Sequence, residues 1–365
     1  MDMTSRAGSG AQAPEVFRNG YRFRNSPQAV LRFPFPFATD AYGVTVNVEP
    51  HDRTGETEAF RALFDVDEHY HAEIAEREHL LAQDPARLQM APHMALAQWE
   101  ILELVMTGLA TDFPARFRLT RDGDRWAWVN ALLGLEQRFV FGDPCSLPRP
   151  PFDFIARQVQ GDFMLMDQRG GDLWLEGGLV TQSFGWSFDF ILGMNWTEWH
   201  GPVTKAKERE VIERARRMTM ALTPERPLRR VNWLLQARPR LDRSLETLRE
   251  WRAEEQALTP ERIGRDLFLR TEFQQLYKLP RSGAVLFALR HYLLSFDDLA
   301  GVPKWARRLH RVLRDLDPET ERFATTRNRR MAADWLARFD DGAPTGPGRG
   351  PDPDGAQGGG DVALR

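Results

Sequence analysis

The chain has 365 residues, 42% of them apolar, and its 49 lysines and arginines nearly balance 52 aspartates and glutamates. This length is enough to bury a large core, and a net charge of −3 provides no basic field for nucleic acid. The only cysteine, Cys145, can form no internal disulfide and cannot hold an iron–sulfur cluster, which normally needs four thiolates. Electrons for a redox reaction would therefore come from another chain or cofactor.

The two ends of the sequence have a composition that predicts disordered tails. Residues 1–14 contain no apolar run, so we expect no secretory signal. Residues 342–365 include GAPTGPGRGPDPDGAQGGG, and a stretch so rich in Gly and Pro does not bury a core. Within residues 15–341 no comparable linker appears, and no apolar stretch approaches the length of a membrane span. We therefore expect one continuous domain in a cytoplasmic protein.

Helices are predicted first along the chain. Apolar periodicity indicates one helix over residues 67–83 and a more apolar one over 94–113. The stripe of the first helix consists of Tyr70, Ile74, Arg77 and Leu81. The buried positions expected in the second are Trp99, Leu102 and Met106.

Strands follow. FRLTRDGDRWAWVN predicts a hairpin turned at Asp122-Gly123. Residues 163–182 predict further strands with turns at Gly170-Gly171 and Gly177-Gly178.

The second half of the chain alternates between helices and strands. A charged helix is expected at 207–222 and two strands at 266–276 and 284–294, joined by YKLPRSG. Two more helices are expected at about 297–315 and 327–339. Strand pairs joined by short turns predict an antiparallel sheet with helices packed on it, which is the α+β class.

The segment RTEFQQL contains a polar stripe. Side chains alternate along a strand, so Arg270, Glu272 and Gln274 share one face. That face is either the solvated side of a half-buried sheet or the wall of a pocket. In the second case Arg270 would orient Glu272 as an acid/base group or proton relay.

NWTEWHGPV contains a histidine between a tryptophan and a Gly-Pro turn. His200 is either a structural residue or a ligand. Gly201-Pro202 would aim its side chain, and Trp196 and Trp199 offer flat apolar surfaces for a planar cofactor. Imidazole is also the most common proximal ligand of haem.

Three blocks carry a family resemblance: LGMNWTEWHGPV, RPLRRVNWLL and LFLRTEFQQLYKLPRSGAVLFALRHYL. Together with weaker matches over roughly residues 30–325, they resemble the haem-dependent oxidative N-demethylases, the haem subunit of dimethylamine monooxygenase. The resemblance implies a PAS-like core that binds haem b. It implies oxidation of a methyl group on a secondary amine by dioxygen and two electrons, converting dimethylamine to methylamine and formaldehyde.

The resemblance also implies roles for individual residues. His200 would be the metal ligand, Trp199 and Arg270 would contact the cofactor, and Glu272 and Gln274 would be catalytic. A flavin/iron–sulfur reductase would supply electrons from NADPH within a hetero-oligomer. The family often has a pair of acidic residues where this chain has Gly161 before Asp162. This departure bears on which amine is the substrate. Two alternatives stay open: a non-catalytic haem-binding sensor, and a haem-free structural subunit of an amine-oxidation complex.

Overall fold

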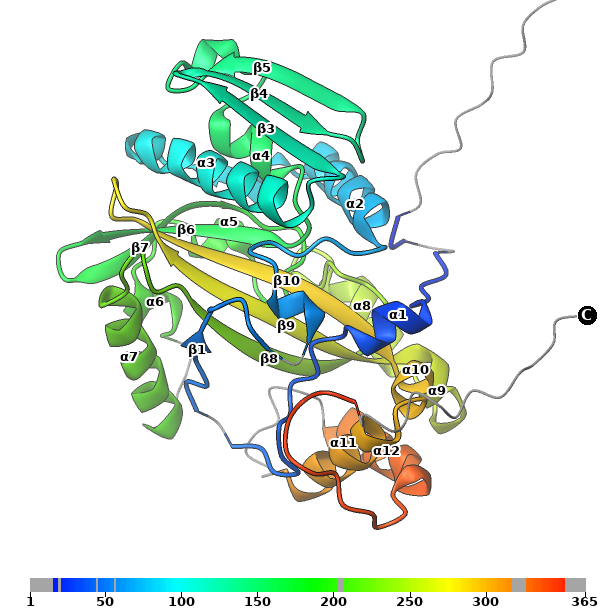
Figure 1. Ribbon diagram of the computed structural model, residues 1–365. Helices are drawn as coiled ribbons and strands as arrows, with labels where there is room; N and C mark the ends of the chain where they lie inside the picture. Colours follow the sequence, from blue (N-terminus) through cyan, green and yellow to red (C-terminus); the bar gives the residue numbers. More distant parts are fainter. Residues whose placement is uncertain are drawn as a thin grey trace, which may run out of the picture.

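A mixed arrangement of helices around an antiparallel sheet forms the molecule (Figure 1). The computed structural model describes residues 16–18, 21–43, 45–55, 57–201, 206–316 and 326–351. Within these residues, seven strands form the main sheet in the order β1-β8-β9-β10-β6-β7-β2, and every neighbouring pair is antiparallel. The strands are β1 (Glu49–Pro50), β2 (Leu88–Met90), β6 (Asp162–Arg169), β7 (Asp172–Leu179), β8 (Leu228–Ala237), β9 (Leu267–Lys278) and β10 (Val285–Ser295).

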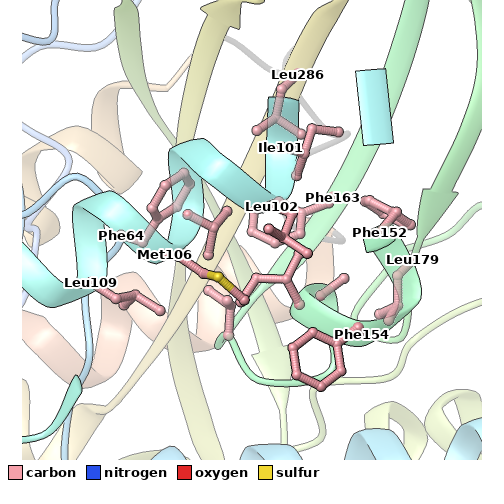
Figure 2. Close-up of a cluster of buried hydrophobic side chains, with 14 of the residues drawn as sticks. Phe64, Ile101, Leu102, Met106, Leu109, Phe152, Phe154, Phe163, Leu179 and Leu286 are labelled. Carbon is pink, nitrogen blue, oxygen red and sulfur yellow. The ribbon is translucent and has the colours of Figure 1, made fainter. Parts of the chain in front are cut away.

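One face of this sheet is covered by three helices, and a small second sheet lies above them (Figure 1). The helices are α2 (Tyr70–Gln83), α3 (Ala95–Asp112) and α4 (Pro151–Ala156), and the small sheet has β3 (Phe117–Asp122), β4 (Arg125–Asn130) and β5 (Leu135–Val140). Figure 2 shows Leu102 and Met106 of α3 packed with Phe163 of β6 and Leu286 of β10. Full burial of such a side chain contributes roughly 1.5–3 kcal/mol, so this layer fixes one side of the strands.

The opposite face of the same strands meets a second set of helices. These are α5 (Phe188–Ile191), α6 (Trp196–Trp199) and α7 (Ala206–Met220). Because successive side chains alternate, Met164 and Met166 of β6 belong to this side whereas Phe163 and Leu165 pack under α3. The sheet is therefore buried on both faces, and its second face is available to build an internal site.

The remaining helices gather at the end of the sheet where β10 ends (Figure 1). They are α1 (Pro27–Leu31), α8 (Leu248–Gln256), α9 (Ile263–Asp266), α10 (Phe296–Ala300), α11 (Pro303–Asp315) and α12 (Thr326–Leu336). Trp305 of α11 is fully buried and stacks on Phe35 with ring centroids 5.0 Å apart. This contact ties the N-terminal segment to the C-terminal helices.

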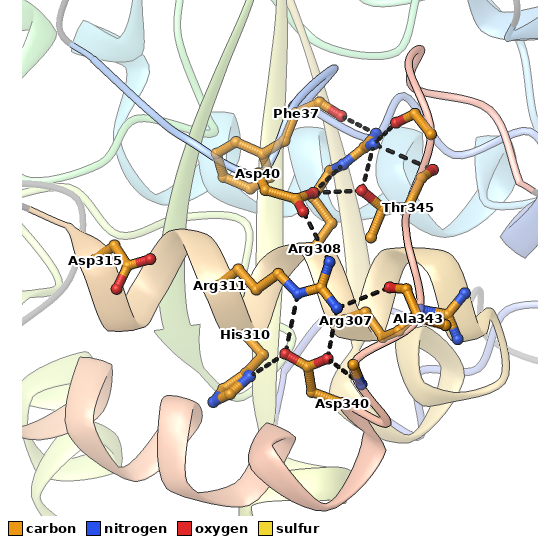
Figure 3. Close-up of polar contacts among 12 residues, drawn as sticks. Phe37, Asp40, Arg307, Arg308, His310, Arg311, Asp315, Asp340, Ala343 and Thr345 are labelled. Carbon is orange, nitrogen blue, oxygen red and sulfur yellow. Dashed lines mark hydrogen bonds and ion pairs between the residues drawn. The ribbon is translucent and has the colours of Figure 1, made fainter.

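Residues 340–351 cross α11, and we call this segment the C-terminal strap (Figure 3). The buried guanidinium of Arg308 donates to Thr345 Oγ1 (2.9 Å) and to the carbonyl oxygens of Gly346 and Gly348. The structure thus differs from the tail predicted to start at residue 342. The reason is that a buried arginine needs acceptors, and glycine-rich backbone can approach closely enough to supply them. Residues 352–365 lie outside the described part of the chain.

Most of the predicted elements are confirmed, including the α+β class, the helix stripe of α2 and the Gly170-Gly171 turn. The first hairpin turns one residue later than predicted, at Gly123-Asp124. The predicted turn at Gly177-Gly178 is wrong, because both residues lie inside β7. A side chain at Gly177 would collide with Met90 of β2, so these glycines mark close packing rather than a turn.

Candidate functional site

A cavity of about 270 Å³ lies between the second face of the sheet and helices α6 and α7. This volume is slightly below the ~300–1,000 Å³ typical of small-molecule sites. Much of the lining is apolar and includes Met164, Met166, Leu276, Phe287, Trp196 and Ile212. Such a wall suits a ligand with a large apolar surface.

The N-terminal segment closes another side of the cavity through Tyr42, Thr45 and Val48. This stretch runs beside the sheet edge, where Asn47 Nδ2 donates to the carbonyl oxygen of Val231 (2.9 Å) and β1 pairs with β8. This wall of the cavity therefore comes from Tyr42, Thr45 and Val48, which are distant in sequence from the strands beside them.

His200 follows the last residue of α6 and lines the cavity. A capping box holds the start of this short helix: Asn195 Oδ1 accepts from Glu198 N (2.9 Å), and Glu198 Oε2 accepts from Asn195 N (3.0 Å). Trp196 Nε1 also donates to the carbonyl oxygen of Ile212 in α7 (3.3 Å). These contacts place the imidazole. The predicted role of the Gly201-Pro202 turn stays a prediction, because Pro202 lies outside the described residues.

The imidazole of His200 is held in one orientation and one tautomer. Its ring lies 4.5 Å from the ring of Trp196 and 4.9 Å from that of Trp199, and Nδ1 lies 2.8 Å from the carbonyl oxygen of Trp196. A carbonyl only accepts, so Nδ1 carries the hydrogen and Nε2 carries the lone pair of the neutral ring. Metal-ligating histidines commonly have their other ring nitrogen bonded to a backbone carbonyl in this way.

A polar row crosses three strands on the sheet side of the cavity. Asn232 of β8, Glu272 of β9 and His291 of β10 are direct cross-strand partners, and all three line the cavity. Glu272 Oε2 accepts from Asn232 Nδ2 (3.1 Å) and from Gln274 Nε2 (3.0 Å). Glu272 and Gln274 are only 8% and 9% exposed, so the solvated-face interpretation of this strand is wrong.

Arg270 lies behind Glu272 and is absent from the cavity lining formed by the described residues. Its fully buried guanidinium donates to the carbonyl oxygen of Leu241 (2.8 Å) and to that of Gln182, and its Nε lies 3.8 Å from Glu272 Oε1. Burial lowers the pKa of Arg270 to about 10, and the carboxylate of Glu272 opposes that shift. Arg270 remains a cation beside Glu272 and behind the cavity wall, and its predicted contact with a cofactor stays a prediction.

Of the predicted site residues, His200, Trp199, Glu272 and Gln274 line the same cavity. Sequence reasoning missed Asn232 and His291. Asn232 is flanked by apolar residues in VNWLL, and His291 follows Arg290 in LRHYLL; polar residues within these mainly apolar runs were the available signal. Their position beside Glu272 depends on strand register, which local sequence does not specify.

This fold and site define an α+β protein with an internal cavity that is partly apolar and presents the imidazole of His200 from a helix end, with the carboxylate of Glu272 and the imidazole of His291 from the sheet. A family model described as haem-dependent oxidative N-demethylase, alpha subunit-like, matches residues 56–332. The match covers most of the chain and includes His200 and Glu272, and the chain belongs to this family. Among the described residues, no helix has both the length and the apolar character needed to cross a bilayer.

Proposed function

We propose that this chain is the haem-binding subunit of an amine monooxygenase that demethylates a secondary amine such as dimethylamine with dioxygen. Electrons would come from NADPH through a flavin/iron–sulfur reductase. The observation that carries the proposal is the tautomer of His200, whose Nδ1 bonds the Trp196 carbonyl on the wall of an apolar cavity. Membership of a haem-dependent oxidative N-demethylase family supports it independently.

The residues around the cavity fit a haem group. His200 would hold the iron through Nε2, and the rings of Trp196 and Trp199 with the thioethers of Met164 and Met166 provide apolar contacts for a macrocycle. When bound, haem supplies the oxidising chemistry at the methyl C–H bond that no side chain can supply.

The polar row would act on the amine. A dialkylamine is protonated in water, and the buried carboxylate of Glu272 provides the negative charge to attract it. Asn232 and Gln274 hold Oε2 of Glu272, while Arg270 lies beside Oε1. In this arrangement Glu272 accepts a proton from the bound ammonium and serves as the proton relay of the cavity.

The PAS-like description of the core also belongs to this proposal. Support comes from the five central strands, which stand in the order β7-β6-β10-β9-β8. Numbered along the chain, this is 2-1-5-4-3, with α5–α7 inserted between the second and third strands. The single cysteine supports a separate reductase, since an iron–sulfur cluster normally needs four thiolates.

Absorbance spectroscopy and product analysis test the proposal. Purified protein should show a Soret band, and His200→Ala should lose or shift that band, whereas His93→Ala, at an exposed histidine, should leave it unchanged. Formaldehyde should form from dimethylamine only when a flavin/iron–sulfur reductase and NADPH are both present. A normal Soret band and normal turnover in His200→Ala would reject His200 as the ligand. A haem protein that releases no formaldehyde with any reductase would instead be a sensor.

A further inference from the structure

His291 faces the cavity beside Glu272. The two residues are cross-strand partners, and His291 Nε2 lies 3.8 Å from Glu272 Oε1. This separation is too long for a direct hydrogen bond. Both side chains are nevertheless largely buried, at 2% and 11% exposure, and both contribute to the cavity wall.

The protonation of His291 is set by its neighbours. Gln182 Nε2 donates to the carboxylate of Glu73 (3.2 Å), which turns Gln182 Oε1 toward His291 Nδ1 (2.7 Å). An amide oxygen only accepts, so Nδ1 of His291 carries the hydrogen and Nε2 is the acceptor of the neutral ring. Burial and the cations Arg270, Arg290 and Arg77 lower the pKa of His291 well below its usual value, which keeps the ring neutral.

Two acceptors therefore face each other across a short gap: Oε1 of Glu272 and Nε2 of His291. A third acceptor belongs to the same row, because Oδ1 of Asn232 is buried with no hydrogen-bond partner among the described residues. Buried acceptors favour a ligand that brings donors. A dialkylammonium has two N–H groups on one nitrogen and can donate to both Glu272 and His291. A trialkylammonium has one N–H, and a tetraalkylammonium has none.

We propose that His291 is a specificity-determining residue that accepts the second N–H of an ammonium whose first N–H is bound by Glu272. The identity of the ligand rests on the proposed function, but the inference concerns binding alone. When one proton passes from nitrogen to Glu272, the amine becomes neutral and Glu272 becomes a carboxylic acid. The remaining N–H still donates to His291, and the nitrogen lone pair accepts from Glu272.

Calorimetric titration with dimethylammonium and trimethylammonium chloride tests this assignment. We expect the wild-type protein to prefer dimethylammonium by roughly 10- to 100-fold, the range for one hydrogen bond to a charged group. His291→Leu should bring the two affinities close to parity. His51→Leu removes another buried imidazole that is not part of the cavity lining and should keep the wild-type ratio. A preference that persists in His291→Leu would reflect ligand size and would overturn the assignment.

A measurement on the unmodified protein covers the case in which His291→Leu does not fold. In ¹⁵N NMR of the diamagnetic ferrous carbon monoxide form, or of the protein as purified if it carries no haem, the ring of His291, assigned separately from the rings of His51 and His200, should have Nδ1 protonated and Nε2 unprotonated. Dimethylammonium should shift that Nε2 resonance and tetramethylammonium should not. A doubly protonated ring, or an equal response to both ions, would overturn the proposal.

The two proposals fail in different ways. If the protein binds no haem yet His291 controls the preference for dimethylammonium, the proposed function is wrong and this inference stands. If formaldehyde forms from dimethylamine but the affinity ratio is independent of His291, the function stands and this inference is wrong.

Discussion

Gly161 and Leu289 approach so closely that a methyl group on the α-carbon of Gly161 would collide with the carbonyl oxygen of Leu289. Gly161 also has a φ of +89°, a backbone conformation that favours glycine. It comes just before β6, next to Asp162, and Leu289 lines the cavity. This contact fixes the spacing of β6 and β10 where the cavity begins.

Gly161→Ala should therefore lower the free energy of unfolding by about 2–4 kcal/mol, from steric overlap and left-handed strain together. Gly170→Ala is the matched control, because its φ is +59° but no atom lies within reach of the added methyl group. We expect about 1 kcal/mol for the control. Urea denaturation of the two variants measures the difference, and equal costs would show that the contact with Leu289 is unimportant.

His51 should make the protein sensitive to acid. Burial, together with Arg229 and Arg53, lowers its pKa from 6.5 to about 4. As the pH falls from 6.5 to 4 the unfolded chain takes up a proton that the folded chain does not, so stability is lost in this window, by as much as ~3 kcal/mol. His51→Gln should reduce the loss measured by denaturation at pH 7 and pH 4.5. Identical losses in both proteins would assign the acid sensitivity to other groups.

Glu272→Gln should keep the fold and any bound haem, since the side chain changes little in shape. It should lower the rate of formaldehyde formation by ~10²–10⁴-fold, the usual effect of losing a general acid/base. Formaldehyde formed per electron pair consumed should also fall. Glu176→Gln is the control, at a largely buried carboxylate that pairs with Arg169 and is not part of the cavity lining. An unchanged rate and yield in Glu272→Gln would remove Glu272 from the mechanism.

Ending the chain after residue 342 should destabilise it by about 2–4 kcal/mol, because the buried Arg308 loses its acceptors on the C-terminal strap. Arg311 would also lose the carbonyl oxygen of Ala343 (2.8 Å; Figure 3). A chain ended after residue 351 keeps all of these contacts and should unfold like the complete protein. Thermal unfolding distinguishes the two, and equal midpoints would show that the strap contributes nothing.

Local patterns in the sequence predicted the parts of the site that depend on local geometry. Strand alternation placed Glu272 and Gln274 on one face, and the proximity of His200 to Trp196 and Trp199 follows from their spacing. The polar row could not be predicted, because Asn232 and His291 reach Glu272 through the register of strands distant in sequence. Composition likewise could not predict the strap, since what orders its glycines is Arg308, a residue almost forty positions earlier.

The segment that carries Tyr42, Thr45 and Val48 is held at two points by the strap. Thr345 Oγ1 and Arg308 bind Asp40 before it, and Arg349 Nη1 binds Glu49 after it (3.2 Å). This segment and the strap both lie outside residues 56–332, the region that the family model matches, whereas Arg308 lies within it. In this chain, residues 56–332 alone therefore leave out Tyr42, Thr45 and Val48 of the cavity wall. Differences in ligand choice within the family should be sought in the flanking sequences as well as in the shared motifs.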